Sequence, residues 1–292
     1  MFVDNLHRFV FEQLPVRGAI VHLHGVWQEA LQRRRYPNAI ATILGQAMAA
    51  SALLAATVKG RGQLTLQLQS EGSLNLVLSQ CTGARELRGL ARWRDDHHQG
   101  ELDVLCNPGT LAITLDPEGS RERYQGMVTL GGETLAAALE RYFAQSEQLP
   151  TLLALTADRQ QAVGWLIQRL PAKQHLDSHY EQDWERICHL AATVSPEEIV
   201  ERTPAELLSR VFASDQIRLF PPEPLHFRCS CNRQRIASVL ITLGHQEVEA
   251  ILAEQGTVSV ACEFCGQDYG FDAVDCAGLF SATQTSPSSR RH

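Results

Sequence analysis

The sequence predicts an α+β fold: a hairpin-rich β-sheet domain with packed helices, then a helical linker, then a small cysteine-rich domain. Strand-like segments occur in pairs joined by turns and do not alternate strictly with helices, which is typical of α+β proteins. The clustered cysteines lie near the end of the chain, beyond three prolines in residues 221–224. With 292 residues, 44% of them hydrophobic, the chain can bury one large core and a smaller satellite core.

The first domain is expected to span residues 1–171. Apolar residues from Ile40 to Val58 recur with the 3.6-residue period of a buried helix that starts near Pro37. Alternating leucines predict a β-hairpin that turns at residues 71–73. The expected strands are residues 63–69, 74–79, 111–115, 124–130, 151–156 and 163–170, with a helix from residue 135 that ends before Pro150.

Charge and hydrophobicity argue against nucleic-acid and membrane partners. The net charge of −7 gives no general attraction to nucleic acid or anionic lipid. Residues 1–12 lack the basic stretch and long apolar run of a secretory signal, so we expect a cytoplasmic protein. The most apolar run, residues 47–58, is shorter than the roughly 20 residues needed to cross a bilayer, and it is interpreted as a buried helix.

Residues 172–228 form a predicted linker, because the composition becomes polar and charged after Pro171. Two capping boxes with Pro at the first helical position start at Ser195 and Thr203. The helices that they begin are short and carry few apolar residues, so neither is stable alone. We therefore expect both helices to lie on the N-terminal domain.

The strongest chemical signal is a pair of cysteine motifs, with Cys229 and Cys231 in the first and Cys262 and Cys265 in the second. Four thiolates in two close pairs match the tetrahedral sulfur coordination of one structural zinc ion. Gly266, directly after the second motif, suits a turn around a metal because glycine tolerates positive φ. Four protein ligands leave no position for a substrate, which argues against a hydrolytic enzyme.

These motifs define a predicted zinc domain of residues 229–280, followed by a disordered Ser/Thr-rich tail of residues 281–292. Helices are expected at residues 232–244 and 247–256, each ending at a glycine. So few core residues would not keep the domain folded without metal. The expected core residues are Ile236, Val239, Leu240, Val248, Ile251 and Leu252.

Oxidation offers a way to control such a site. Oxidants attack thiolates, so conversion of the ligands to disulfides would release the ion and couple structure to redox state. Pairing within each motif is the easiest, yet a bond between Cys229 and Cys231 needs backbone rearrangement because residues two apart lie near the limit of disulfide reach. A strained bond of this kind is readily reduced.

Other cysteines and histidines are interpreted structurally. Cys81, Cys106 and Cys188 are isolated in the sequence and are expected to be small hydrophobic residues that the redox switch does not need. Four histidines lack ligand partners at suitable spacing and are expected at the surface: His22, His24, His97 and His98.

Two other functions compete with a zinc-based redox switch. A thiol–disulfide oxidoreductase would use Cys262 and Cys265, but it needs them at a helix N-terminus, and the following GQDYGFD predicts a turn and a strand. A nucleic-acid-binding zinc ribbon would rely on basic residues near the motifs, yet these lack interleaved aromatic residues. The best candidates for that role are Arg228, Arg233 and Arg235.

The cysteine motifs and their spacing resemble the C-terminal zinc module of the 33 kDa chaperonin family, the bacterial redox-regulated heat-shock holdases. The resemblance extends to RYQGMVTLGGETLAAALERYFAQSEQLPT at residues 123–151 and LTLQLQSEGSLNLVL at residues 64–78, and to LHRFVFE and VRG before them. It covers nearly the whole chain. Cys276 departs from the four-cysteine pattern and leaves room for mixed pairing.

The resemblance implies a chaperone and not an enzyme. It implies a reduced, zinc-bound, inactive monomer, and an oxidised, zinc-free form that dimerises and holds unfolding client proteins. It also implies that Cys229 pairs with Cys231 and Cys262 with Cys265 after oxidation, and that residues 172–228 contain metastable helices.

Overall fold

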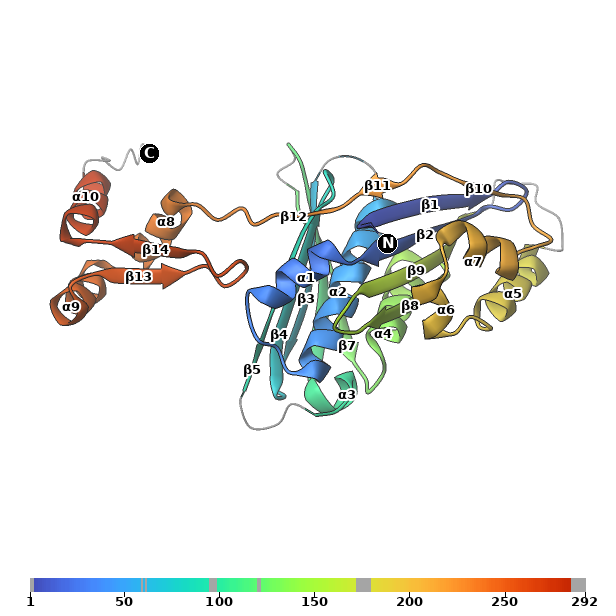
Figure 1. Cartoon of the computed structure of the whole chain (residues 1–292), viewed down its shortest axis with the longest axis horizontal. Coiled ribbons are helices and arrows are strands. Elements are labelled where there is room, and N and C mark those ends of the chain that lie inside the picture. The colour runs from blue at the N-terminus through green and yellow to red at the C-terminus, as the bar shows by residue number, and fades with distance from the viewer. Residues whose placement is uncertain are drawn as a thin grey trace, which may run out of the picture. The chain divides into compact units, whose positions relative to one another are not determined.

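A computed structural model gives the fold of the chain (Figure 1) and describes residues 3–58, 60, 62–94, 99–119, 122–171 and 180–284. The chain forms two compact units, Met1–Arg228 and Cys229–His292. Each unit has a hydrophobic core of its own. The mixed α+β architecture that the sequence predicts is confirmed.

The first sheet of the larger unit has the order β10-β1-β2-β9-β8, and β11 also pairs with β1. Strands β8 and β9 are the predicted closing pair, joined in antiparallel register. Strands β1 and β2 form a hairpin that the sequence analysis did not specify. The bounds are β1 Asn5–Phe11, β2 Val16–Leu23, β8 Thr151–Ala157, β9 Ala162–Arg169, β10 Ile217–Leu219 and β11 Glu223–Pro224.

The second sheet has the order β12-β5-β4-β3-β6-β7. The predicted hairpin is β3 and β4, and the two further predicted strands are β6 and β7, which pair with each other. Strand β12 pairs with β5 in parallel and forms one edge of the sheet, so the last residues of the larger unit belong to this sheet. The bounds are β3 Gly62–Ser70, β4 Leu74–Thr82, β5 Glu86–Trp93, β6 Gly109–Pro117, β7 Tyr124–Leu130 and β12 His226–Phe227.

Helix α2 (Asn38–Thr57) packs against strands of both sheets and forms the centre of the main core. The helix is longer than the apolar run used to judge membrane insertion, because it begins nine residues before that run, at Asn38. By length and composition alone its 20 residues could cross a membrane. However, 72% of its most apolar window is buried inside the protein, which is the property of a core helix.

The remaining helices of this core are short. The helix predicted from residue 135 is confirmed as α4, which Thr134 caps by accepting a hydrogen bond from the Ala137 amide. It continues into a π-helical turn, η1, that ends before Pro150. The bounds are α1 Gly25–Gln32, α3 Leu102–Leu105, α4 Leu135–Tyr142 and η1 Phe143–Glu147.

Three helices after residue 179 cover the other face of the first sheet: α5 (Tyr180–Ala191), α6 (Pro196–Glu201) and α7 (Pro204–Val211). Both predicted capping boxes are present, at Ser195 and Thr203. The helices pack their apolar side chains on the sheet, which confirms the expected support. The division of this unit at residue 171 into a core domain and a linker stays a prediction, and residues 172–179 lie outside the described residues.

The smaller unit has three helices and a two-stranded sheet. The predicted helices are confirmed as α8 (Arg233–Leu243) and α9 (His245–Gln255). Val239 was wrongly expected in the core and is 56% exposed, because it lies opposite Ala237 on the helix. The other elements are β13 Val258–Ala261, β14 Asp268–Phe271 and α10 Ala273–Gln284. Helix α10 includes residues 281–284, which the sequence analysis had assigned to the tail; the rest of the tail lies outside the described residues.

Candidate metal centre

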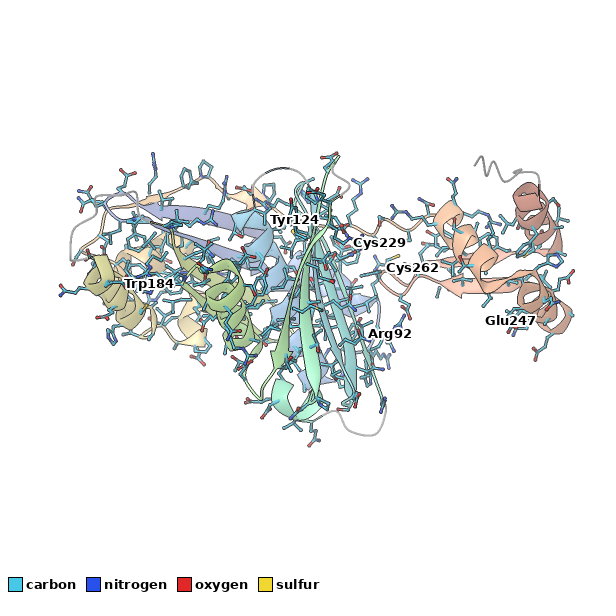
Figure 2. All side chains as sticks on the ribbon, turned by 180° about the vertical axis from the view of Figure 1, so that it is seen from behind. Arg92, Tyr124, Trp184, Cys229, Glu247 and Cys262 are labelled. Atoms are coloured by element: carbon cyan, nitrogen blue, oxygen red, sulfur yellow. The ribbon has the colours of Figure 1, made fainter. Side chains whose placement is uncertain are left out.

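The four cysteines of the two motifs come together in the smaller unit. Their sulfur atoms all lie within 4.8 Å of one another. The Sγ atoms of Cys229 and Cys262 are 3.6 Å apart, and those of Cys231 and Cys265 are 3.3 Å apart. Figure 2 labels Cys229 and Cys262, which lie close together although their segments are far apart in the sequence.

These distances fit a four-sulfur metal site. Sulfurs that bind one zinc ion at about 2.3 Å in a tetrahedron lie roughly 3.8 Å from each other. The donors are all soft thiolates, which favour zinc over calcium or magnesium. The described residues therefore form a cluster that can hold a metal ion with all four coordination positions filled by protein.

Local structure explains how each motif presents two sulfurs. Cys229 and Cys231 lie two residues apart in a segment without regular secondary structure, and both sulfurs reach the cluster. Asn232 then caps α8 by accepting a hydrogen bond from the Arg235 amide at 2.8 Å. The helix therefore begins two residues after the second sulfur.

The second motif lies in the turn between β13 and β14. The Gly266 amide donates to the Cys262 carbonyl at 2.7 Å, and the Cys262 amide donates to the Gln267 carbonyl at 2.9 Å. Gly266 has φ of 65°, which confirms the predicted positive φ. The turn thus directs both sulfurs toward the first motif.

Tyr269 is a contact of the cluster that the sequence analysis missed. Its hydroxyl donates to the Cys231 sulfur at 3.2 Å. Strand pairing explains its place, since Tyr269 lies opposite Val260 in the hairpin that carries the second motif. An aromatic residue four positions after Cys265 was the available signal, but the hairpin register was needed to interpret it.

The remaining cysteines lie outside this cluster. Cys81 and Cys106 are buried, and burial raises the pKa of each thiol to about 12. Burial also raises the pKa of Cys188 and of Cys276, which lies in the core of the smaller unit. A raised pKa leaves little thiolate near neutral pH, so these thiols react slowly with oxidants.

His22 corrects a prediction, because it is buried and not at the surface. Its strand, β2, is covered on one side by α2 and on the other by the helices of residues 180–211. The His22 Nε2 atom lies 3.1 Å from the Ile199 carbonyl oxygen in α6, and since a carbonyl only accepts, Nε2 is the donor. Burial lowers the His22 pKa to about 4; the hydrogen bond to Ile199 opposes this shift by raising the pKa, and His7 adds to the lowering. His24 is partly buried, and His97 and His98 lie outside the described residues.

The geometry gives no support to the competing functions. Cys262 and Cys265 lie in a turn before a strand and not at a helix N-terminus, where a catalytic cysteine pair would have a lowered pKa. The three arginines considered for nucleic-acid binding each interact with a side chain or backbone group of the protein itself. Arg228 pairs with Glu86, Arg233 with Asp275, and Arg235 with Ser230.

Comparisons with known proteins agree with these features. The sequence model of the family described as Hsp33 protein matches residues 4–272. The 33 kDa chaperonins of Nitrosococcus oceani and Ectopseudomonas mendocina are 48% and 44% identical to this chain, and each match covers 99% of both proteins.

A solved structure shows the same fold. The 33 kDa chaperonin of Thermotoga maritima matches with a TM-score of 0.81 at 21% identity, covering 96% of this chain and 99% of that one. Full-length similarity and the family match together settle the classification: the chain belongs to the Hsp33 family of non-enzymatic holdase chaperones, which bind client proteins.

Proposed function

We propose that this protein is a redox-regulated holdase that binds zinc and is inactive when reduced. On oxidation its four cluster cysteines form disulfides, the ion is no longer held, the linker helices detach and unfolding proteins bind to the exposed surface. The observation that carries this proposal is the four-sulfur cluster, because its ligands are both the donors of a structural metal and the groups that oxidants attack. Cys229, Cys231, Cys262 and Cys265 are the proposed metal ligands and redox-active residues.

Metal binding would stabilise a unit that has little else to hold it. Among its described residues, the hydrophobic cluster contains six buried residues: Ala237, Leu240, Val248, Val258, Phe271 and Cys276. Zinc binding in small domains supplies about 10–16 kcal/mol near neutral pH, and that energy is folding energy. Loss of the four donors would therefore unfold the smaller unit.

Oxidation removes all four donors in two balanced steps. In each step two thiolates join in one disulfide and give up two electrons. Hydrogen peroxide accepts these electrons with two protons and becomes two molecules of water. We propose the pairs Cys229 with Cys231 and Cys262 with Cys265; the first needs the local backbone to move, because residues two apart lie near the limit of disulfide reach.

Covalent continuity couples the cluster to the linker. The Arg228 amide donates to the Leu87 carbonyl at 3.1 Å, and this bond is the last one that ties β12 to β5 before Cys229 begins the cluster. A change in backbone conformation at Cys229 would therefore act directly on this hydrogen bond. The preceding strands β10 and β11 are also short, with three and two residues, so few ladder hydrogen bonds hold the segment that follows α7.

The helices would uncover an apolar surface when they detach. Ile199, Leu207 and Phe212 are buried against the first sheet, and the Phe212 ring lies 5.1 Å from that of Phe11 and 6.0 Å from that of Trp165. Exposed apolar surface of this kind binds unfolded chains and favours self-association. We propose that the oxidised form is a homodimer and that the protein works in the cytoplasm.

One experiment on the whole protein tests the proposal. Zinc content, free thiols and suppression of aggregation of an unfolded test protein are measured before and after warm peroxide treatment. We expect one zinc ion per reduced chain, then loss of zinc and of four thiols together with a gain in client holding. The proposal would be contradicted if the reduced, zinc-loaded protein suppressed aggregation of the test protein as well as the oxidised protein does.

Replacing any one cluster cysteine with serine should weaken zinc binding strongly. A serine hydroxyl stays protonated near neutral pH and is a poor replacement for a thiolate ligand. Zinc affinity of the Cys231→Ser protein, measured by competition with a chromogenic chelator, is the test. The control is a variant with Cys81, Cys106 and Cys188 all replaced by Ala, which should keep both zinc binding and activation by oxidant. If the zinc affinity of Cys231→Ser equalled that of the wild type, Cys231 would not be a ligand.

Mild acid should loosen α6 through His22. Its pKa is lowered to about 4 in the folded protein, so neutral His22 stabilises the packed helix above its ordinary pKa. That stabilisation is lost as the pH falls from about 6.5 toward 4, and it reaches about 2 kcal/mol of loss near pH 5. Hydrogen exchange of residues 196–201, corrected for intrinsic pH effects, measures it.

The matched variant is His22→Gln, whose amide nitrogen can donate to the Ile199 carbonyl without titrating. We expect wild-type α6 to lose protection between about pH 7 and pH 5 relative to this variant. Equal losses in the two proteins would exclude His22 as the titrating group.

A further inference from the structure

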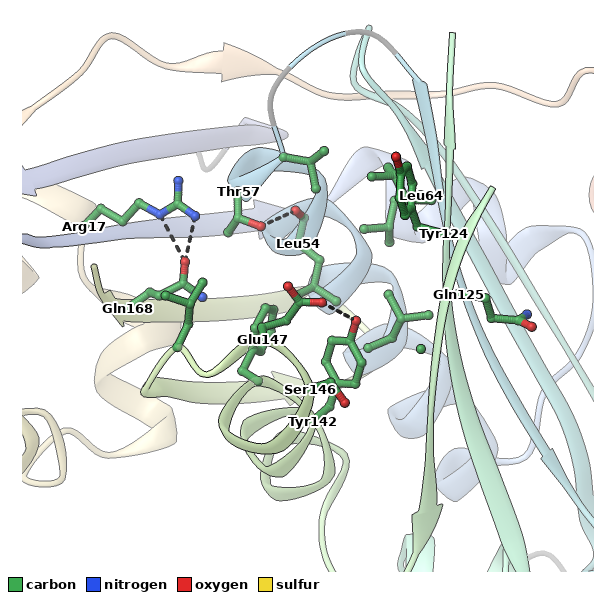
Figure 3. Close-up of a pocket in the computed structure, with 16 residues that line it drawn as sticks. Arg17, Leu54, Thr57, Leu64, Tyr124, Gln125, Tyr142, Ser146, Glu147 and Gln168 are labelled. Carbon is green, nitrogen blue, oxygen red and sulfur yellow. Dashed lines mark hydrogen bonds between the residues drawn. The ribbon is translucent and has the colours of Figure 1, made fainter. Parts of the chain in front are cut away.

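The larger unit contains a cavity of about 550 Å³ that the proposed chaperone cycle does not use. It lies between the two sheets, beside the end of α2 (Figure 3). Strands β2 and β9 supply one wall, β3, β6 and β7 supply another, and η1 closes one side. Small-molecule sites in proteins have volumes of roughly 300–1,000 Å³, so the cavity is large enough for an organic ligand.

Most of the cavity wall is apolar. An aliphatic chain placed against this wall would be removed from water, which is favourable in proportion to the area buried. The apolar lining includes Leu54, Val58, Leu64, Ile113, Leu115 and Phe143.

One end of the cavity carries a positive charge without a negative partner. The Nε and Nη2 atoms of Arg17 both donate to Oε1 of Gln168, at 3.1 and 2.7 Å. Gln168 is neutral and fully buried, and it donates in turn to the Thr151 hydroxyl at 2.9 Å. Among the described residues no carboxylate pairs with Arg17, and partial burial lowers the pKa of its guanidinium.

The opposite charge lies on the π-helical wall. Glu147 accepts a hydrogen bond from the Tyr142 hydroxyl at 2.8 Å, and this bond holds the carboxylate at the cavity. Gln148, the next residue, has φ of 54°, which is unusual for a residue other than glycine. π-Helical turns and such backbone conformations both occur preferentially at functional sites. Glu147 would repel a ligand carboxylate and so direct it toward Arg17.

We propose that this cavity binds an aliphatic monocarboxylate, with the carboxylate on Arg17 and the chain along the apolar wall. The site is independent of the redox cluster. A carboxylate would supply the anion that Arg17 lacks, by accepting hydrogen bonds from the guanidinium N–H groups that Gln168 does not engage.

Calorimetric titration of the reduced, full-length protein with decanoate tests the proposal without any mutation. We expect one saturable site. Octanoate, two methylenes shorter, should bind up to about 15-fold more weakly, since each buried methylene contributes about a fourfold factor. Methyl decanoate should bind at least about tenfold more weakly than decanoate, because its ester group is uncharged and cannot form an ion pair with Arg17. Equal affinity for decanoate and its ester, or no saturable decanoate binding, would overturn the proposal.

Two variants locate the site. Arg17→Met should weaken decanoate binding at least about tenfold and weaken methyl ester binding much less, and the ester binding that remains would show that the cavity is still formed. Arg218→Met removes an exposed arginine that pairs with Glu12 and should bind decanoate like the wild type. Full decanoate affinity in Arg17→Met, or an equal loss in Arg218→Met, would show that the carboxylate does not bind at Arg17.

Discussion

Replacing Leu207 with Asp should make the reduced, zinc-loaded protein hold unfolding clients without any oxidant. Leu207 is fully buried in α7, within the apolar cluster that joins the helices to the first sheet. An unpaired carboxylate in such a place costs several kcal/mol, more than the roughly 2–5 kcal/mol of removing a buried leucine side chain. An eight-residue helix cannot survive alone, so α7 should detach while the α2 core stays folded.

The measurement is aggregation suppression by the reduced variant, with hydrogen exchange across residues 180–228. The matched control is Ala205→Asp, which places the same charge on the exposed face of α7, near its N-terminus, where an acidic residue is favourable. This control should stay inactive. If residues 180–228 of Leu207→Asp exchange rapidly and yet no client is held, exposure of this surface is not sufficient for activity.

Removing the metal under reducing conditions should unfold the smaller unit and leave the larger one folded. The unit has a core of few residues, and metal binding in such domains supplies about 10–16 kcal/mol. Treatment with a chelator and a thiol reductant should therefore abolish protection from exchange in α8, α9 and α10. Helix α2, in the core of the other unit, should keep its protection.

Two controls make this result specific. Addition of zinc after removal of the chelator should restore protection in α8 to α10. The Cys231→Ser protein should lack this protection even before chelation. A smaller unit that stayed protected without metal would show that its side-chain packing alone is sufficient.

The two halves of the cluster could be predicted from the sequence because each motif is local, although the sulfur contacts between the motifs join residues 33 and 34 positions apart. Each motif places two sulfurs within a few residues, and Gly266 and Asn232 mark the turns that orient them. Pairing of strands that are consecutive in the sequence, as in β3 with β4, could likewise be predicted from the alternating leucines and the turn between them. These features depend on contacts between residues close together in the chain.

Features that depend on contacts between residues far apart in the chain could not be predicted from the sequence. Strand β2 is buried on both faces, so it lacks the alternation that marks a half-exposed strand, and the burial of His22 followed from a helix 177 residues away. The short strands β10 to β12 carry too few residues for a periodic signal. The cavity at Arg17 arises only where the two sheets meet the end of α2.

The central claim is that oxidation of the four-cysteine cluster releases the linker helices from the first sheet. Hydrogen exchange of α6 and α7 in wild-type protein, followed during peroxide treatment together with client holding, tests it most directly. We expect α6 and α7 to lose protection from hydrogen exchange in the same samples in which zinc is released and client proteins begin to be held. Client holding by oxidised protein whose α6 and α7 remain fully protected would contradict it.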